Sequence, residues 1–195
     1  GLTAAFYLAQ TGYRPTVFEK NEHPGGMLRY GIPSYKLEKD VLDAEIDVAK
    51  EMGVEIKTGI EVGKDVTIQQ LREQAFYIAI GCSAGSLPDI KNINSQGVMT
   101  AIDYLHESNC GNIPFDGKVV VVGGGNVAID ASRVSSRNKA SQVQQFCLEQ
   151  EVDMPASNEE IAEAREDGVT IHCGWGPQEI IESKCYCFQK MCFRI

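Results

Sequence analysis

The sequence predicts an α/β protein made of two similar units, each with a parallel sheet that carries helices on its faces. Predicted strands alternate with predicted helices along the chain, which is the pattern of β-α-β units. A valine-rich strand at residues 118–122 runs into three consecutive glycines and then into a helix. A helix at residues 2–10 followed by a strand at residues 14–19 repeats the second half of this arrangement. We therefore expect two Rossmann-like domains, an incomplete one at residues 1–114 and another incomplete one at residues 115–195.

The elements of the first unit follow from apolar spacing and from turn-forming residues. Gly12 ends the first helix, and Gly53 ends a second helix at residues 37–52. We expect a loop at residues 21–34, a strand at 54–57, a helix at 68–74, a buried strand at 76–80 and a helix at 101–108. Turn formers at residues 109–114 predict the domain boundary. The chain enters a helix directly after Gly1, so we expect the first strand of this unit to be missing.

The second unit is predicted to begin with the strand at residues 118–122. We expect next a helix at residues 126–136, a strand at 142–148, an exposed helix at 158–167 capped by Ser157, and a strand at 169–173. A final strand begins at Cys185, and the sequence ends inside it. We therefore expect the chain to be truncated at both ends.

The overall composition excludes several classes of function. The 195 residues are 43% hydrophobic and 23% charged, so the chain can bury a core. A net charge of -9 argues against a nucleic-acid partner. No apolar run approaches the roughly 18 residues that span a bilayer, and no signal peptide is apparent, so we expect a cytoplasmic protein without a membrane partner. The seven cysteines are expected to be reduced.

The clearest motif is G-x-G-x-x-A, formed by Gly123, Gly125 and Ala128 between a strand and a helix. Gly123 permits the tight turn, Gly125 lets the backbone approach a diphosphate, and Ala128 allows the helix to pack closely on the strand. The helix N-terminus favours an anion, so we predict that this turn binds a dinucleotide. The alternative is a glycine-rich turn without a ligand.

Glu149 lies at the end of the next predicted strand, where an acid holds the adenosine ribose hydroxyls in such units. Its negative charge would oppose the 2′-phosphate of NADP, and the nearest preceding basic residues are Arg137 and Lys139. The sequence therefore favours NAD over NADP. A solvated glutamate at a strand end is the alternative.

A second dinucleotide site is predicted at the start of the chain. Glu19 ends the strand at residues 14–19 as a second ribose-binding acid, and Gly1 would be the last glycine of a motif whose earlier part is missing. Gly25 and Gly26 form a glycine pair just beyond Glu19. Two dinucleotide units in one chain suit a permanently held flavin and an exchangeable nicotinamide, between which hydride passes. Such chemistry belongs to the cofactors, so we predict no catalytic side chains.

These residues together resemble the family of the glutamate synthase small (beta) subunit and related FAD-dependent oxidoreductases, which includes the flavin and nucleotide domains of dihydropyrimidine dehydrogenase. The resemblance spans nearly the whole chain. It is carried by GLTAAFYLAQTGY leading to TVFEK, by PGGMLRYGIPSYKLEKDVLDAEI, by FYIAIGCSAG, by GKVVVVGGGNVAIDASR and by VDMPASNEEIAEAREDGV. The block at residues 25–37 is the most specific, because its glycines, Arg29 and Ile32-Pro33 have no general structural necessity.

The resemblance implies where both cofactors lie. FAD is expected along Gly1, Glu19, Lys20, Gly25, Gly26, Leu28 and Arg29, with Gly81 closing over it. The nicotinamide dinucleotide is expected along Gly123, Gly125, Asn126 and Val127. The resemblance also implies that electrons pass to an iron-sulfur domain or a large catalytic subunit, with clusters either in a region ahead of Gly1 or in the partner.

The sequence departs from the family at one informative place. Many members carry paired arginines after the second strand of the nucleotide domain and use NADPH, whereas this chain has Leu148-Glu149, which favours NADH. Cys185, Cys187 and Cys192 lack a clear fourth ligand, so we predict no metal site.

Two other functions stay open at this point. One is a non-catalytic nucleotide-binding fragment, suggested by the cut motif at Gly1. The other is a reductase similar to dihydropyrimidine dehydrogenase, with a separate substrate domain.

Overall fold

The computed structural model describes residues 1–72, 75–112, 117–181 and 185–190, the last range as backbone only. The chain divides into two compact units, Gly1–Ser83 and Ala84–Ile195. This division comes earlier in the sequence than the turn formers at residues 109–114, because the helix that precedes them packs within the second unit. The assignment of residues 1–114 and 115–195 to separate cofactors stays a prediction.

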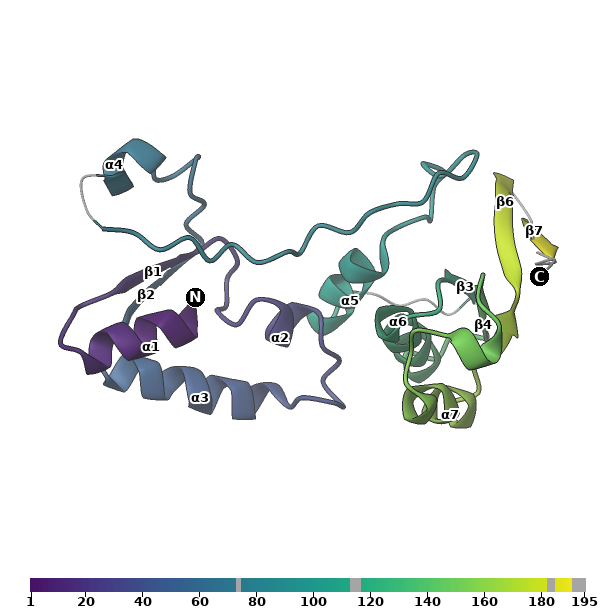
Figure 1. Cartoon of the computed structure of the whole chain (residues 1–195), viewed down its shortest axis with the longest axis horizontal. Coiled ribbons are helices and arrows are strands. Elements are labelled where there is room, and N and C mark those ends of the chain that lie inside the picture. The colour runs from purple at the N-terminus through teal and green to yellow at the C-terminus, as the bar shows by residue number, and fades with distance from the viewer. Residues whose placement is uncertain (73–74, 113–116, 182–184, 191–195) are drawn as a thin grey trace. The chain divides into compact units, whose positions relative to one another are not determined.

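The first unit is a small α/β layer (Figure 1). Strand β1 (Thr16–Glu19) pairs in parallel with β2 (Glu55–Thr58), and Thr16 lies opposite Glu55. Helices α1 (Leu2–Gln10) and α3 (Lys39–Glu51) contact each other beside this sheet. Their small apolar residues allow close packing, and the core consists of Ala5, Ala49 and Val54 with Phe6, Ala9, Val17 and Ile56 against it. The unit also contains α2 (Met27–Tyr30) and α4 (Ile68–Arg72).

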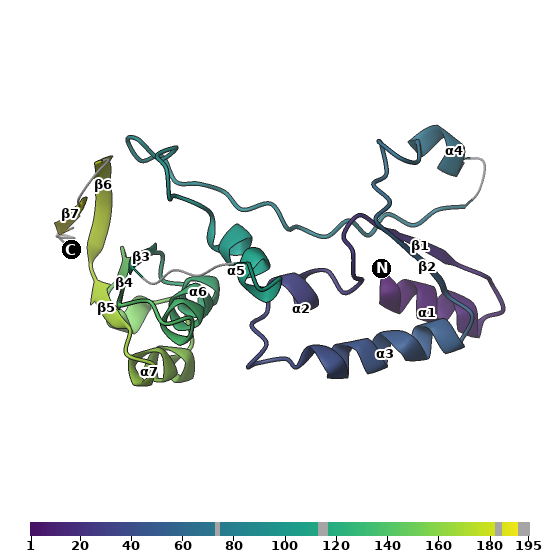
Figure 2. The same cartoon turned by 180° about the vertical axis from the view of Figure 1, so that it is seen from behind.

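The second unit contains a parallel sheet of order β3-β4-β5 (Figure 2). Its strands are β3 (Lys118–Val122), β4 (Gln142–Cys147) and β5 (Thr170–Cys173). Helices α6 (Asn126–Arg137) and α7 (Asn158–Glu166) bury a common core against it, which includes Ile129, Val143, Cys147, Ile161 and Ala164. The unit also contains α5 (Ala101–Asn109), the short 3-10 helix η1 (Glu151–Asp153), and an antiparallel pair, β6 (Trp175–Ile181) and β7 (Cys185–Lys190).

Side-chain caps explain where two of these helices begin. The Ser157 hydroxyl oxygen accepts a hydrogen bond of 3.3 Å from the Glu160 N–H at the start of α7, which confirms the predicted cap. Thr100 accepts a bond of 3.1 Å from the Asp103 N–H at the start of α5 in the same way.

One predicted strand is wrong. Residues 76–80 have no regular secondary structure, and the side chains of Tyr77 and Ile80 are 72% and 88% exposed. A strand requires a hydrogen-bonded neighbour, and within the described residues β1 pairs only with β2. The apolar character of this segment predicts burial, but no strand beside it provides that burial.

Three elements, α2, β6 and η1, are absent from the sequence-based prediction. Residues 21–34 are not entirely loop, because α2 forms directly after the glycine pair. Strand β6 begins at Trp175, within a Gly-Trp-Gly-Pro stretch that indicates a loop, and pairing with β7 extends it. The predicted helix at residues 68–74 is seen as α4, and residues 73–74 lie outside the described ranges, as do residues 191–195 of the predicted last strand.

A buried cation joins α6 to the end of α7. The Arg133 side chain is 6% exposed, and its Nε lies 2.7 Å from Asp167 Oδ2, while Nη1 contacts Glu163 and Glu160. Arg137 Nη2 lies 2.9 Å from Asp167 Oδ1. Burial alone would raise the pKa of Asp167, but the hydrogen bonds from Arg133 and then Arg137 outweigh it and hold this pKa below its usual value.

Candidate functional site

The three glycines between β3 and α6 form a turn with distinct demands at each position. Gly123 has φ +140°, which favours glycine, and a Cβ there would lie 3.3 Å from the Ala128 Cβ. Ala128 therefore lies close to the turn at Gly123. At Gly125, the N-cap of α6, a Cβ would meet nothing within 4 Å. The turn is therefore open on the side of the Gly125 Cβ position.

The start of α6 offers backbone donors toward this open side. Ala128 and Ile129 donate to the Gly125 carbonyl oxygen at 3.0 and 3.1 Å, which are the first bonds of the helix. The N–H groups of Gly125, Asn126 and Val127 precede these bonds, so they can donate hydrogen bonds to an anion. Val127 is also 46% exposed. These features fit the diphosphate of a dinucleotide.

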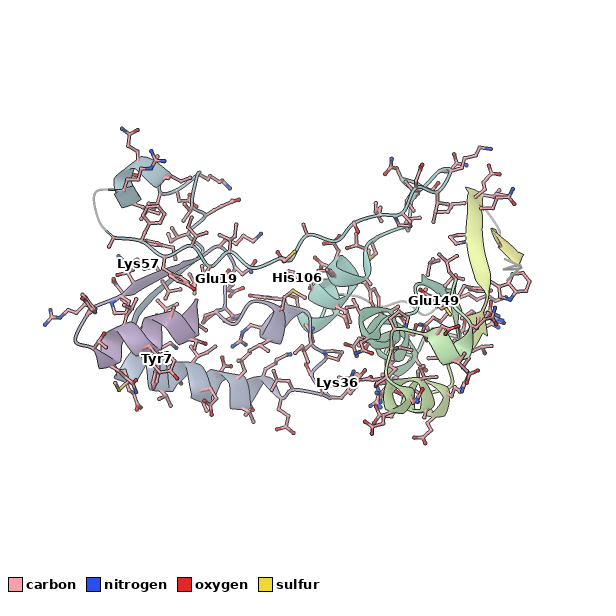
Figure 3. All side chains as sticks on the ribbon, in the orientation of Figure 1. Tyr7, Glu19, Lys36, Lys57, His106 and Glu149 are labelled. Carbon is pink, nitrogen blue, oxygen red and sulfur yellow. The ribbon has the colours of Figure 1, made fainter. Side chains whose placement is uncertain are left out.

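Glu149, which is labelled in Figure 3, lies against the same turn. A Cβ on Gly124 would be 2.7 Å from Glu149 Oε2 and 3.1 Å from the Cys147 Cβ. The second strand therefore brings the acid next to the glycine turn, where the sequence motif predicts a ribose. Gly124 was not among the predicted site residues, and the run of three glycines is the signal that points to it.

The segment before α7 is fastened to the turn. The Ala156 N–H donates to the Gly124 carbonyl oxygen at 3.0 Å, and the Ser157 N–H donates to Asn126 Oδ1 at 3.1 Å. The Asn126 amide oxygen is thus engaged in holding Ser157. Sequence reasoning did not identify residues 156–157 as part of the site, because their role depends on backbone bonds.

Cys147 is next to this site, and its thiol is expected to be unreactive. Burial, followed by the neighbouring Cys173, raises the pKa of the Cys147 thiol to about 12. Its Sγ contacts the Glu149 and His172 carbonyl oxygens at 3.6 and 3.8 Å. A thiol with such a pKa stays protonated near neutral pH, so Cys147 is a packing residue and not a nucleophile.

The predicted flavin-side acid sits at the end of β1. Glu19, which is labelled in Figure 3, accepts a hydrogen bond of 2.9 Å at its Oε1 from the Asn21 N–H. Gly1 caps α1, and a Cβ there would lie 3.4 Å from the Ala79 Cβ. Gly81 has φ +68° with nothing within 4 Å of a Cβ, and Lys20 is exposed. The fold thus places Gly1, Glu19 and Gly81 in one unit, with open space at Gly81.

The glycine pair after Glu19 shapes the backbone ahead of α2. Gly25 has φ +127°, and a Cβ there would lie 3.1 Å from Leu42 Cδ2 and 3.2 Å from the Arg29 Cβ. Gly26, with φ +54° and nothing within 4 Å, is the N-cap of α2. Leu28 is 48% exposed. This backbone can approach a cofactor at Gly26 without a side chain in the way.

Arg29 is used inside the protein. Its side chain is 11% exposed, its Nε donates to the Pro24 carbonyl oxygen at 2.7 Å, and its Nη2 pairs with Asp43. Lys39 Nζ donates to the Leu28 and Ile32 carbonyl oxygens at 3.0 and 2.7 Å. Burial, followed by the Arg29 charge, lowers the pKa of Lys39. Both cations brace the loop around α2, and direct contact of Arg29 with FAD stays a prediction.

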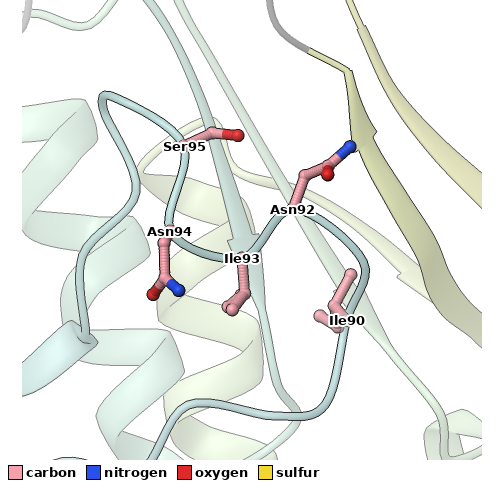
Figure 4. A pocket seen from close by; sticks show the side chains of 5 residues that line it. All are labelled: Ile90, Asn92, Ile93, Asn94 and Ser95. Atoms are coloured by element: carbon pink, nitrogen blue, oxygen red, sulfur yellow. The ribbon is translucent and has the colours of Figure 1, made fainter.

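His172 and Trp175 pack against the ring of Phe146. The His172 ring stacks on Phe146 at 4.4 Å, and Trp175 meets Phe146 edge-on at 6.5 Å. A shallow pocket before α5 is lined by Ile90, Asn92, Ile93, Asn94 and Ser95 (Figure 4). It contains none of the predicted site residues.

Neither a metal cluster nor a membrane helix is found in the part of the chain that the structure describes. No three His, Cys, Asp or Glu side chains there are grouped to hold a metal ion. Cys192 lies outside the described residues, and the side chains of Cys185 and Cys187 are not described. None of the described helices has the length and apolar character needed to cross a bilayer.

Comparison with known families decides the wider relationship. The pyridine nucleotide-disulphide oxidoreductase family matches residues 1–190. The chain belongs to this family. The predicted relationship and the predicted α/β fold class are both confirmed.

Several curated relatives of this pyridine nucleotide-disulphide oxidoreductase chain are similar over most of its length. The NADP(+)-dependent formate dehydrogenase subunit beta of Moorella thermoacetica is 38% identical over 94% of this chain and 27% of its own length. The NAD-dependent dihydropyrimidine dehydrogenase subunit PreT of Escherichia coli K12 is 37% identical over 94% of this chain and 45% of its own. The glutamate synthase [NADPH] small chain of Halomonas elongata is 36% identical over 93% and 41%. The chain spans less than half of each of these relatives.

Solved structures share the fold at low sequence identity. FprA of Mycobacterium tuberculosis in complex with NADPH matches with a TM-score of 0.73 at 14% identity, over 93% of this chain and 58% of that one. Thioredoxin reductase of T. acidophilum matches with a TM-score of 0.69 at 16% identity, over 97% and 67%. Both support the fold of this pyridine nucleotide-disulphide oxidoreductase chain.

Proposed function

We propose that this chain provides FAD-binding and nicotinamide-binding parts of a flavoprotein oxidoreductase that transfers electrons from NAD(P)H, with NADH favoured, to FAD. The observation that carries the proposal is the Glu149 carboxylate lying against the open glycine turn ahead of α6. In this proposal residues 1–114 bind FAD, and residues 115–195 bind the nicotinamide dinucleotide.

The chain's own residues bind and orient in this scheme. Bound FAD supplies hydride acceptance and onward electron transfer. Glu19 holds the ribose of FAD, while Gly26 lets the backbone come close to it. Glu149 holds the adenosine ribose of NADH, and the N-terminus of α6 binds the diphosphate. No side chain is required to transfer a proton.

The preference for NADH rests on Glu149. The named relatives include an NAD-dependent subunit as well as NADPH- and NADP(+)-dependent ones, so family membership leaves the nucleotide open. A 2′-phosphate beside the Glu149 carboxylate would place like charges close together, which disfavours NADPH.

A charge reversal tests this preference. We expect Glu149→Arg to raise kcat/KM for NADPH relative to NADH by at least about tenfold, since a charged hydrogen bond is worth about 1.5 to 3 kcal/mol. Flavin reduction by each nucleotide, followed by stopped-flow absorbance in the purified protein, measures it. Glu166→Arg is the matched control, because Glu166 is an exposed residue in the last turn of α7. A wild-type protein that prefers NADPH would contradict the role of Glu149.

The electron acceptor is proposed to be an iron-sulfur domain or a large catalytic subunit, in the cytoplasm. Support comes from relatives that are named as subunits of larger enzymes. Iron-sulfur clusters would then lie in the partner or in a region ahead of Gly1. Co-purification followed by iron and sulfide analysis tests this, and a flavoprotein that isolates alone and reduces no cluster protein would contradict it.

One alternative is favoured by a specific observation. The 37% identity to the dihydropyrimidine dehydrogenase subunit PreT favours a role in pyrimidine reduction with a separate substrate domain. NADH oxidation that depends on added uracil or thymine would support this alternative. The other alternative, a non-catalytic nucleotide-binding fragment, would be excluded if the purified protein bound FAD and reduced an artificial acceptor with NADH.

A further inference from the structure

Two fully buried polar side chains connect α6 and β4 to the glycine turn. Ser132 in α6 and Gln145 in β4 are both 0% exposed. The Ser132 hydroxyl donates to Gln145 Oε1 at 2.9 Å, and Gln145 Nε2 donates to the Gly123 carbonyl oxygen at 2.9 Å. The chain of hydrogen bonds thus ends on the backbone of the turn.

Burying Ser132 and Gln145 in an apolar core costs free energy unless their polar groups are hydrogen-bonded. Gln145 lies between Val143 and Cys147, which belong to the apolar core beneath α6 and α7. A buried amide that loses its partner retains its full desolvation cost, so Gln145 is constrained to keep both bonds. The Gly123 carbonyl lies just beyond the end of β3, where the strand's pairing with β4 stops at Val122. The Gly123 carbonyl oxygen therefore has its hydrogen bond from the Gln145 side chain and not from the β3–β4 pairing.

The direction of this peptide group decides where the next donor points. The described chain contains no cis peptide bonds, and in a trans peptide the carbonyl of one residue and the N–H of the next point in opposite directions. With the Gly123 carbonyl drawn toward Gln145, the Gly124 N–H points away from the buried amide. We propose that Gln145, oriented by Ser132, is a positioning residue that fixes the donors of the turn for a dinucleotide diphosphate. This inference rests on the proposed nucleotide site.

The test separates diphosphate binding from binding of the rest of the nucleotide. ADP carries the diphosphate and adenosine lacks it, so their dissociation constants are measured by calorimetry on the purified protein saturated with FAD. For Gln145→Met, which keeps the length of the side chain, we expect ADP to bind about five- to tenfold more weakly, from the loss of one net hydrogen bond. Adenosine is expected to bind as it does to the wild type. Gln144→Met is the matched control, because Gln144 is the preceding residue on β4 and points to the other face of the sheet.

A milder variant keeps the test decisive if Gln145→Met does not fold. Ser132→Ala leaves the Gln145 bond to Gly123 in place but removes the group that orients the amide, so we expect ADP to bind about two- to threefold more weakly. The Gly124 amide signal in NMR spectra of glycine-labelled protein is expected to shift less on ADP addition in this variant than in the wild type.

The outcomes distinguish this inference from the proposed function. Equal ADP affinity in the wild type and the variants overturns the positioning role alone. Equal weakening of ADP and adenosine also overturns it, because a general loss of the site would then explain the result. A wild-type protein that binds neither compound overturns the nucleotide site and the positioning role together.

Discussion

Gly124 and Gly125 are neighbours in one turn, yet glycine is needed at each for a different reason. At Gly124 a side chain would meet the Glu149 carboxylate from within the protein. At Gly125 a Cβ would fit without any contact, so the protein alone does not require glycine there. We expect the requirement for glycine at position 125 to come from the proposed dinucleotide.

This difference predicts an unusual result for Gly125→Ala. Gly125 has φ -91° and ψ 171°, which any residue adopts, but alanine is a poorer N-cap than glycine, so this cost is expected to offset the gain of about 0.4 to 1 kcal/mol through the unfolded state and to leave the free energy of unfolding nearly unchanged. The same methyl group would stand where the diphosphate comes close, so NADH is expected to bind about tenfold more weakly, a loss of about 1.4 kcal/mol. Urea unfolding and NADH titration measure the two effects.

Gly117→Ala is the control for this prediction, since a Cβ there also meets nothing within 4 Å but Gly117 precedes β3. Unchanged NADH affinity in Gly125→Ala would mean that the dinucleotide does not come close to the protein backbone at Gly125.

At the scale of elements, the Arg133 network joins α6 to the end of α7 through Asp167. Asp167 has a pKa held below its usual value in the folded protein, so its contribution to stability is present above the unfolded pKa of about 4 and is lost as the pH falls through the folded pKa. We expect Asp167→Asn to lower the free energy of unfolding at pH 7 by about 1.5 to 3 kcal/mol. The difference from the wild type is expected to shrink as urea unfolding is repeated at steps below about pH 4.

Asp47→Asn is the matched control, because Asp47 forms only an exposed ion pair with Lys50 on α3, and such pairs contribute little. A pH-independent cost for Asp167→Asn would contradict the electrostatic role of this carboxylate.

Elements with a complete local signal were predictable from the sequence. Strand β3, the glycine turn and α6 follow one another with matching periodicity, and Ser157 caps α7 as expected. The segment at residues 76–80 has the apolar composition of a strand, but strand formation depends on a neighbour that local sequence does not specify. Helix α2 depends on Gly25 and Gly26 together with the buried contacts of Arg29, which no periodicity reveals.

The same limit applies to the candidate site. Glu149 and the G-x-G-x-x-A glycines are set by spacing and could be named in advance. Gly124, Gln145 and residues 156–157 act through contacts between segments distant in sequence, so only the fold identifies them.

For the whole molecule, the two predicted cofactor sites belong to different compact units. We therefore expect a substitution in one site to weaken binding of its own cofactor and to leave binding of the other cofactor unchanged. We expect Glu19→Ala to reduce the FAD content of the purified protein. Gly125→Ala is expected to keep its FAD, which dithionite still reduces, while reduction by NADH is slowed. The flavin absorption spectrum before and after each reductant measures both effects.

Lys57→Ala is a suitable control for Glu19→Ala. Lys57 is on β2, opposite Phe18 of β1, and its side chain is about half exposed. If Glu19→Ala kept a full complement of FAD, the assignment of residues 1–114 to the flavin would be contradicted.

Helix α7 is attached to the β3-α6 segment at both ends, through Gly124 and Asn126 at its start and through Asp167 at its finish. The backbone of the glycine turn is therefore held by the fold itself, so we expect little of its conformational entropy to be lost when the proposed dinucleotide binds. We expect such a preorganised turn to bind the proposed dinucleotide without a closing motion of its own, so that nucleotide exchange is governed by dissociation of the contacts themselves.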